Sequence, residues 1–550
     1  MNITRVSVDS AGNQAIGGFL LGSFIPSISA DGRFVAFTSL VTNLVPGDTN
    51  NQNDIFVRDL LTNTTTRVSV DSAGNQALGS SFVPSISANG RFVAFASEAP
   101  NLVPGDNNNS QDIFVRDLLT NTTTRVSVDS AGNQGNSNSG FLSISGDGRF
   151  VAFVSRATNL VPGDNNNSQD IFVRDLLTNT TTHVSVDSAG NQGNDASYSP
   201  SISANGRFVA FASEAPNLVP GDTNNDEDIF VRDLLTNTTT RVSVDSASNQ
   251  AIGNSGDPSI SADGRFVAFG SDASNLVSGD TNRSRDIFVR DTRSNTTTRV
   301  SVSGVGNQVI GNSGDPSISG DGRFVVFASA APNLVPGDNN NSQDIFVRDL
   351  STNTTTRLSV DSTGNQAISS SFVPSISSDG RFVAFASEAP NLVPGDTNNS
   401  IDIFVSDTGV INTSSNNLTG TPGNDNLTGT PGNDIINGLR GNDILNGGGG
   451  NDNLNGGKGF DTLNGGLGND NLVGGAGNDV FVLGAGLGVD TISDFANGQD
   501  TFQLINGLTF GQLSISAGTN STLIRVVSTN EVLAALTGIA PNLIGIEDFV

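Results

Sequence analysis

The C-terminal region carries one carboxylate at a fixed, repeated spacing. Seven nine-residue units run without interruption from Gly420 to Val482, beginning with GTPGNDNLT and ending with GGAGNDVFV. The sixth position is always aspartate and the eighth is always apolar. The aspartates are Asp425, Asp434, Asp443, Asp452, Asp461, Asp470 and Asp479. Carboxylates repeated in this way within glycine-rich turns indicate a row of oxygen ligands for a hard cation.

The pattern resembles the GGxGxDxUx nonapeptide of RTX (haemolysin-type) calcium-binding proteins. In such a unit six residues form a turn that glycine follows most easily, and three form a short strand with its apolar residue inward. Two units complete one coil of a parallel β-roll, so aspartates 18 residues apart stack on one edge at roughly 5 Å. Calcium held between successive turns by carboxylates and backbone carbonyls would remove their repulsion.

The predicted metal ligands are these aspartates and four turn positions. The turn positions are Gly447, Gly449, Gly456 and Lys458. Stacking on two edges leaves about five gaps between aspartates, and therefore about five calcium ions are expected. Thr421 and Thr430 each precede a proline in the first two units, where the pattern has glycine, so we expect those turns to bind poorly. A flexible glycine-rich linker would not need this strict register.

A longer unit of about 58 residues repeats upstream of the ladder. The motif DIFVRD begins at Asp54 and recurs until DIFVSD at Asp402. Four strands are expected in the first unit: Pro26–Ser29, Arg33–Ser39, Asp54–Leu60 and Thr65–Val70. Seven four-stranded units predict a seven-bladed β-propeller. The last unit lacks its TRVSV strand, and Thr4–Val8 is expected to supply it and close the ring.

The SADGRFVAFAS and DIFVRDLLTNTTTRVSV segments resemble the TolB-like, WD-type propeller repeats of bacteria. This resemblance implies a fold more than a function. Loops after the second and fourth strands of each blade should ring one face of the propeller. The loop NLVPGDTNNQND places oxygens at Asp48, Asn50, Gln52 and Asp54, which could wrap a cation. The alternative is a solvated turn whose polar side chains bond their own backbone.

Composition and the chain ends suggest where the protein acts. The 54 acidic and 26 basic residues give a net charge of -28, which disfavours nucleic acid and favours cations. Cysteine is absent, and no run of 18 apolar residues predicts a transmembrane helix. The N-terminus has no apolar signal segment, whereas the C-terminal GIEDFV resembles an uncleaved type I secretion signal. We therefore expect an extracellular or cell-surface protein exported by a type I secretion apparatus.

These observations predict an all-β chain with four regions. They are a propeller (1–407), a linker (408–419), an RTX β-roll (420–482), and a β-rich cap with the secretion signal (483–550). The favoured function is calcium binding coupled to folding after export, with the propeller binding a protein or ligand. A cell-surface scaffold is one alternative.

A secreted hydrolase is the other alternative, in which acids unique to single blades would act. These acids are Asp195, Asp226, Glu227, Asp257 and Asp315. They form no recognisable pair in the sequence. Their clustering at one channel mouth would favour an enzyme, whereas seven-fold uniformity favours binding or scaffolding. His183 replaces an arginine of the repeat, and we expect it to be a surface substitution.

Overall fold

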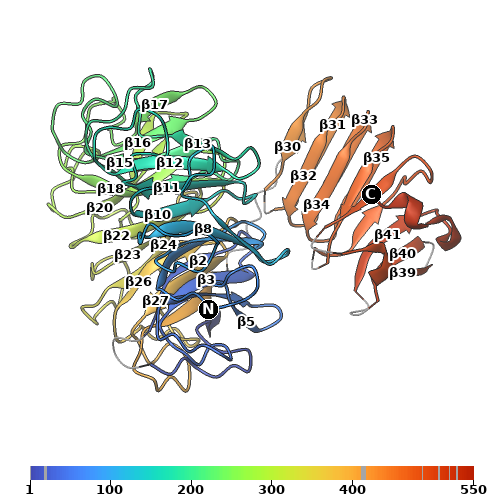
Figure 1. Ribbon diagram of the computed structural model, residues 1–550, viewed down its shortest axis with the longest axis horizontal. Helices are drawn as coiled ribbons and strands as arrows, with labels where there is room; N and C mark the ends of the chain where they lie inside the picture. The colour runs from blue at the N-terminus through green and yellow to red at the C-terminus, as the bar shows by residue number, and fades with distance from the viewer. Residues whose placement is uncertain are drawn as a thin grey trace. The chain divides into compact units, whose positions relative to one another are not determined.

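The computed structural model describes residues 2–17, 22–409, 417–430, 432–485, 487–505, 508–518, 521–527 and 531–550. The chain divides into two compact units, Met1–Val410 and Ile411–Val550 (Figure 1). Residues 410–416 of the expected linker lie outside the described residues. The regular structure of the described part is strand, apart from three short 3-10 helices, which confirms the predicted all-β fold. None of its helices is long and apolar enough to cross a membrane.

Seven four-stranded antiparallel sheets form the N-terminal unit, one for each repeat (Figure 1). The innermost strands are β2 (Ser23–Ile28), β6 (Ser81–Ile86), β10 (Ser139–Ile144), β14 (Ser197–Ile202), β18 (Ser255–Ile260), β22 (Ser313–Ile318) and β26 (Ser371–Ile376). The second strands are β3 (Phe34–Ser39), β7 (Phe92–Ser97), β11 (Phe150–Ser155), β15 (Phe208–Ser213), β19 (Phe266–Ser271), β23 (Phe324–Ser329) and β27 (Phe382–Ser387).

The third strands all begin with the aspartate of the DIFVRD or DIFVSD motif. They are β4 (Asp54–Asp59), β8 (Asp112–Asp117), β12 (Asp170–Asp175), β16 (Asp228–Asp233), β20 (Asp286–Asp291), β24 (Asp344–Asp349) and β28 (Asp402–Asp407). The outer strands are β5 (Thr64–Arg67), β9 (Thr122–Arg125), β13 (Thr180–His183), β17 (Thr238–Arg241), β21 (Thr296–Arg299), β25 (Thr354–Arg357) and β1 (Asn2–Arg5).

The N-terminal strand closes the ring, as predicted. β1 pairs antiparallel with β28, from Asn2 opposite Asp407 to Arg5 opposite Phe404. The last blade thus takes three strands from the end of the propeller and one from its beginning. Without β1 the backbone edge of β28 would be left unpaired.

The inner strands are joined directly at one end of the ring. At seven equivalent positions a backbone N–H donates to the carbonyl oxygen of the next blade, at 2.9–3.1 Å. The seven residues are Ala30, Ala88, Gly146, Ala204, Ala262, Gly320 and Ser378, and the last donates back to the first. Each is followed by an Asp-Gly or Asn-Gly turn, such as Asp379-Gly380 after Ser378. Gly32 has φ +73, and a Cβ there would lie 2.1 Å from the Phe382 ring.

Two parallel sheets form the roll of the C-terminal unit (Figure 1). One contains β29 (Asn417–Thr419), β31 (Ile435–Arg440), β33 (Asn453–Lys458), β35 (Asn471–Ala476) and β37 (Asp490–Ile492). The other contains β30 (Asn426–Thr428), β32 (Ile444–Gly449), β34 (Thr462–Leu467), β36 (Val480–Leu483) and β38 (Thr501–Leu504). Strands β29 to β36 pair residues 18 apart, such as Ile436 with Leu454, and β37 and β38 pair with residues 20 and 21 positions earlier. The coil therefore continues to Leu504, beyond the nonapeptide pattern.

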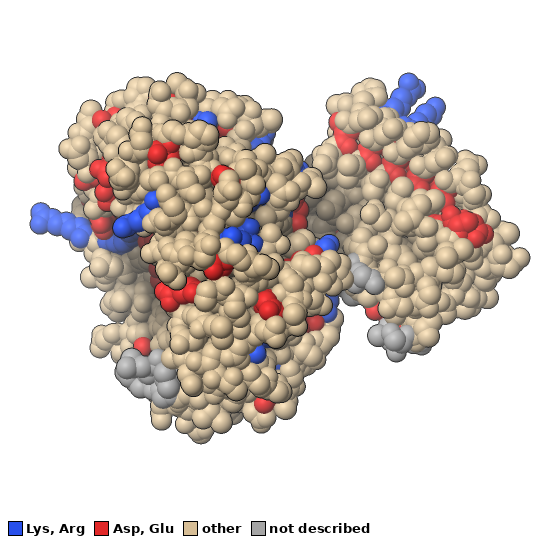
Figure 2. Space-filling model, in the orientation of Figure 1, with Lys and Arg blue, Asp and Glu red and all other residues tan. Residues whose placement is uncertain are grey.

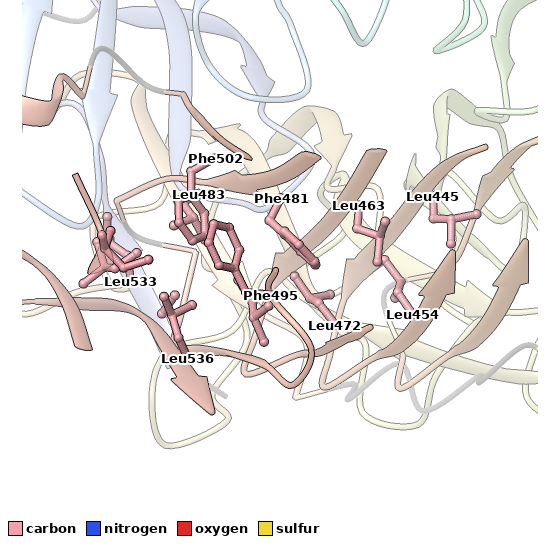
Figure 3. Packing of buried hydrophobic residues seen from close by; sticks show 14 of the residues in the cluster. Leu445, Leu454, Leu463, Leu472, Phe481, Leu483, Phe495, Phe502, Leu533 and Leu536 are labelled. Carbon is pink, nitrogen blue, oxygen red and sulfur yellow. The ribbon is translucent and has the colours of Figure 1, made fainter. Parts of the chain in front are cut away.

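The apolar position of each nonapeptide fills the interior between the sheets. Leu445, Leu454, Leu463, Leu472 and Phe481 point toward one another there (Figure 3), each at most 1% exposed. Burial of one such side chain contributes about 1.5–3 kcal/mol, so this row carries much of the stability of the roll.

The cap closes the last coil. It contains η1 (Phe510–Gln512), β39 (Leu513–Ala517), β40 (Ser521–Val526), β41 (Val532–Thr537), η2 (Pro541–Leu543) and η3 (Ile546–Asp548). β41 pairs in parallel with β37, and β40 pairs antiparallel with β41, so the cap extends one sheet of the roll.

Candidate metal centre

Five carboxylates of the ladder, those of Asp443, Asp452, Asp461, Asp470 and Asp479, are each bound to the neighbouring coil through one oxygen. Asp443 Oδ1 accepts a hydrogen bond from the backbone N–H of Asp425 at 2.8 Å. Asp452 Oδ1 accepts one from Asp434 at 2.7 Å. The same contact, at 2.8–2.9 Å, joins three further pairs: Asp443 with Asp461, Asp452 with Asp470, and Asp461 with Asp479. The 18-residue stacking expected from the nine-residue period is therefore built into the backbone hydrogen bonds.

The second oxygen of most of these carboxylates has no partner in the protein. The buried, unpartnered Oδ2 atoms belong to Asp443, Asp452, Asp461, Asp470 and Asp479. Each of these residues is only 1% exposed. A buried carboxylate oxygen without a hydrogen bond is costly unless a cation or proton compensates it.

Backbone carbonyls converge on the same places. A Cβ built on Gly438 would lie 2.4 Å from Asp443 Oδ2 and 2.6 Å from the carbonyl oxygen of Gly456. A Cβ built on Gly447 would lie 2.2 Å from Asp452 Oδ2 and 2.4 Å from the carbonyl oxygen of Gly465. The first glycine of each of the first five units thus leaves space beside one carboxylate and one carbonyl, and Gly465 and Gly474 leave space beside one carboxylate. This all-oxygen donor set fits calcium.

The predicted turn positions lie in two different places. Gly447 and Gly456 border the space beside the unpartnered oxygens. Gly449 and Lys458 are the last residues of β32 and β33. There the Gly449 N–H donates to the Thr430 carbonyl oxygen at 3.0 Å, and the Lys458 carbonyl accepts from Gly441 at 2.9 Å. The equivalent first glycines, not identified from the sequence, are Gly438, Gly465 and Gly474. Their nine-residue spacing in the sequence is the signal that could have identified them.

The first two turns are satisfied by the protein itself. The Thr421 N–H donates to Asp425 Oδ2 at 2.6 Å, and its hydroxyl lies 3.1 Å from the same oxygen. Thr430 makes the equivalent contacts to Asp434 Oδ2 at 2.5 and 3.0 Å. These donors take the role that a cation would have, which gives a physical reason to expect weak binding at these turns.

Burial makes the ionised ladder unfavourable without a cation. Burial, with a smaller contribution from the neighbouring carboxylates Asp470 and Asp434, raises the pKa of Asp452 to about 7. Burial likewise raises the pKa of Asp479 to about 6. A divalent ion between the turns would stabilise the charged forms of these groups. Figure 2 shows a row of acidic side chains crossing the strands of the C-terminal unit.

The ladder continues beyond the nonapeptides. Asp490 Oδ1 accepts from the Asp470 N–H at 3.2 Å, and Asp500 Oδ1 accepts from the Asp479 N–H at 2.9 Å. Burial, followed by the charge of Asp470, raises the pKa of Asp490 to about 8. Both oxygens of Asp494 already have partners in the protein, because they accept hydrogen bonds from the N–H groups of Gly474 and Gly475 at 3.0 and 2.8 Å.

The NLVPGD loops of the propeller hold an arginine where a cation would lie. Arg67 Nη1 is 3.4 Å from Asp48 Oδ1 and 3.8 Å from Asp54 Oδ2. Asn50 donates to Asp54 Oδ2 at 3.1 Å, so the alternating oxygens are largely occupied within the protein. Equivalent pairs are Arg5–Asp396, Arg125–Asp106, Arg241–Asp222, Arg299–Asp280 and Arg357–Asp338. Among the described residues, no three or more His, Cys, Asp or Glu side chains converge as a metal cluster.

His183 belongs to this buried network, so the expected surface substitution is wrong. Its Nε2 lies 3.1 Å from Asp170 Oδ1, and its ring stacks on Phe172 with centroids 5.0 Å apart. The side chain is 13% exposed. The register of β13 on β12 places residue 183 opposite Phe172, which turns it toward the carboxylates.

Three of the five acids unique to single blades, Glu227, Asp257 and Asp315, are brought together near Arg285. Asp257 pairs with Arg285 at 3.0 Å, and the charges of both affect Glu227 and Asp315. Their side chains come from successive blades of the ring. The propeller is therefore not uniform at its centre.

Comparisons with known proteins agree with the C-terminal geometry. The family model described as the RTX calcium-binding nonapeptide repeat (4 copies) matches residues 419–454, 446–481 and 455–492. No curated protein matches the sequence.

Several solved structures resemble much of the chain at low identity. An oligogalacturonate lyase in complex with manganese is 13% identical at a TM-score of 0.44, covering 74% of this chain and 92% of its own. The β-propeller domain of the Trilobed protease from Pyrococcus furiosus is 12% identical at 0.43, covering 71% and 96%. A putative TolB from Agrobacterium tumefaciens is 16% identical at 0.35, covering 65% and 98%.

The strand pairing of the chain itself defines the seven blades. The matched repeats and the stacked aspartates identify RTX calcium-binding repeats in the C-terminal unit. The protein is a calcium-binding protein with a seven-bladed propeller module.

Proposed function

We propose that the protein is exported and that calcium binding to the roll drives folding of the C-terminal unit outside the cell. The propeller serves as a protein- or ligand-binding module. The calcium-driven folding in this proposal rests on five buried aspartate Oδ2 atoms that have no partner in the protein.

In this proposal each ion is held by an aspartate Oδ2 and by the carbonyl oxygen of a first glycine one coil further on. Asp443 with Gly456, and Asp452 with Gly465, are the clearest examples. Calcium supplies positive charge between carboxylates that burial otherwise penalises. Sites of this kind bind at about 0.1–1 mM, so they are empty in the cytosol and fill outside the cell. Binding free energy then becomes folding free energy.

The C-terminus supports the order of export and folding. The Phe549 ring packs on Phe502 and Phe510, with centroids 5.1 and 5.0 Å apart. The Val550 N–H donates to the Phe502 carbonyl oxygen at 2.9 Å. Folding therefore fixes these residues on the cap and β38, although Ile546 and Val550 stay 67% and 73% exposed. A secretion signal here would be an unstructured segment in low cytosolic calcium and an ordered one after export.

Calorimetric titration and circular dichroism of the full chain test the calcium sites. Asp452→Asn should lower the number of bound ions and weaken the calcium-dependent gain in ordered structure. Asp425→Asn is the matched control, because Thr421 already satisfies its Oδ2, and it should change the stoichiometry less. If the two variants behave alike, the assignment of Oδ2 as a ligand is wrong.

The hydrolase alternative rests on the clustered acids at the propeller centre. A pair with separated pKa values is the usual arrangement for acid–base hydrolysis. Here Asp257 is engaged by Arg285 at 3.0 Å, which favours binding over catalysis. Hydrolysis of a substrate that Glu227→Gln abolishes would reverse this preference.

A further inference from the structure

One face of the propeller presents exposed aliphatic side chains at five of seven equivalent positions. They are Ile16 (75% exposed), Leu78 (67%), Ile252 (69%), Ile310 (70%) and Ile368 (63%). We call them the aliphatic arc. The remaining two positions are Asn136 and Asn194. These side chains lie singly on separate loops of one face, so a partner that spans several blades would bury them together.

The backbone holds these side chains in place. Each lies in the loop between an outer strand and the next innermost strand. The Ile310 N–H donates to Asn333 Oδ1 at 2.9 Å, and the Ile16 N–H donates to Asn43 Oδ1 at 2.8 Å. Both asparagines belong to NLV loops, so the arc lies on the face of the NLVPGD loops. A surface that is already ordered loses little entropy when a partner binds.

The innermost strands begin on this same face, and their second and third residues differ around the ring. The third residue has a positive φ in every blade. The pairs are Phe24–Ile25, Phe82–Val83, Gly140–Phe141, Tyr198–Ser199, Gly256–Asp257, Gly314–Asp315 and Phe372–Val373. Three adjacent blades are thus wholly apolar here, whereas the blades of β18 and β22 carry glycine and aspartate. Among the seven equivalent pairs, glycine followed by aspartate occurs only in the neighbouring blades of β18 and β22.

Arg285 is accommodated in that sector by two glycines. A Cβ on Gly256 would lie 2.9 Å from Arg285 Nη2, and one on Gly270 would lie 2.7 Å from Arg285 Nε. The blade of β6 carries Phe82 and Ala96 at these positions. Arg285 Nη2 is 3.0 Å from Asp257 Oδ2 and Nη1 is 3.8 Å from Asp272 Oδ2. The two glycines thus leave space on the sheet for the guanidinium group, which pairs with the carboxylate of Asp257.

Negative charge remains in excess beside this arginine. Glu227 Oε1 lies 3.5 Å from the same Gly256 Cβ position. Burial, followed by the charge of Asp257, raises the pKa of Glu227 to about 7 and raises that of Asp315. Counting Asp272, four carboxylates interact with one arginine, which leaves room for a further positive charge. An incoming cation would stabilise the ionised carboxylates, whereas an anion would be repelled.

We propose that this face docks a protein segment in which a basic side chain is flanked by apolar residues. The basic group enters the centre of the ring beside Glu227, Asp257 and Asp315. The flanking apolar residues pack on the aliphatic arc and on the apolar blades of the ring. The charge cluster fixes which partner binds, and the arc supplies buried area. This inference rests on the proposed role of the propeller as a binding module.

The test selects a phage-displayed library of random peptides on the full chain in calcium. Enriched peptides should contain lysine or arginine beside aliphatic or aromatic residues. A synthetic copy of the most enriched peptide should lose about tenfold or more in affinity when its basic residue is replaced by glutamine. Glu227→Gln and Ile310→Asn should each weaken binding by a similar factor.

Leu235→Asn is the matched control. Leu235 is 71% exposed but lies in the turn between β16 and β17, on the opposite face, and its replacement should not change binding. The calcium isotherm of every variant should match that of the unmodified chain, which separates this test from the calcium proposal. Enriched peptides without a basic residue, equal binding to all variants, or no enrichment at all would each overturn the docking proposal.

Discussion

Replacing Gly456 by alanine tests the geometry of one calcium site. The added Cβ would lie 2.5 Å from Asp461 Oδ2 and 2.7 Å from the carbonyl oxygen of Gly474. Since Gly456 does not have a positive φ, alanine fits its backbone and the change acts on the space between the oxygens. At these distances the two oxygens must move apart or the ion cannot enter. We expect the loss of one site.

The magnitude follows from the linkage between binding and folding. A site at a calcium concentration 100-fold above its Kd stabilises the folded state by about 2.7 kcal/mol. For a unit of this size, loss of that amount lowers Tm by about 8 °C. Differential scanning calorimetry of the full chain in saturating calcium measures the shift of the C-terminal transition. Calorimetric titration should show about one ion fewer.

Gly423→Ala is the control for this experiment. A Cβ at Gly423 would meet only Thr421 Oγ1, at 3.7 Å, and its φ is not positive. Reduced backbone entropy of the unfolded chain should make this change neutral or slightly stabilising. If Gly456→Ala keeps the stoichiometry and Tm of Gly423→Ala, the space beside Asp461 is not a calcium site and the reasoning fails.

Three further predictions concern pH, packing and closure. In EDTA, the folded-state pKa values of Asp452 and Asp479, about 7 and about 6, lie above the ordinary 3.8. The folded roll then binds more protons than the unfolded chain, so its stability should fall as pH rises from about 4 to 7. Calcium should remove most of this pH dependence. Denaturant unfolding at several pH values measures it, and stability that rises with pH in EDTA would contradict the prediction. Leu463→Ala should lower the free energy of unfolding by about 2–5 kcal/mol even in saturating calcium. Ile444→Ala is the control: at a position 52% exposed, it should change that free energy by under about 1 kcal/mol. Equal losses for the two variants would place residue 463 outside the core. Deleting residues 2–5 should lower the propeller Tm and promote association through the edge of β28, and light scattering that shows an unchanged monomer with an unchanged Tm would argue against the closure.

Periodicity predicted the parts of the fold that repeat. The 58-residue unit indicated four strands per blade, and the missing last strand indicated closure by the N-terminus, which the pairing of β1 with β28 confirms. The nine-residue unit predicted the 18-residue stacking, which the pairing of Ile436 with Leu454 shows. Periodicity was informative here because each repeat buries its apolar positions only against its neighbours.

Contacts that depend on register were not visible in the sequence. Arg67 lies 19 residues after Asp48, and only the pairing of β5 with β4 brings them to 3.4 Å. For the same reason His183 looked like a surface residue. Glu227, Asp257 and Asp315 lie in different repeats, and radial arrangement of the blades brings them into one sector. The roll continues to Leu504 although the glycine pattern ends, because β37 and β38 keep inward apolar residues.

The central claim is that calcium lies between the coils of the roll, against Asp Oδ2 atoms and glycine carbonyls. A crystal structure of the full chain grown in calcium, with anomalous difference maps, tests it most directly. We expect peaks at about 2.3–2.6 Å from Oδ2 of Asp443, Asp452 and Asp461, and none between Asp48 and Arg67. An empty ladder, or ions in the NLVPGD loops instead, would contradict it.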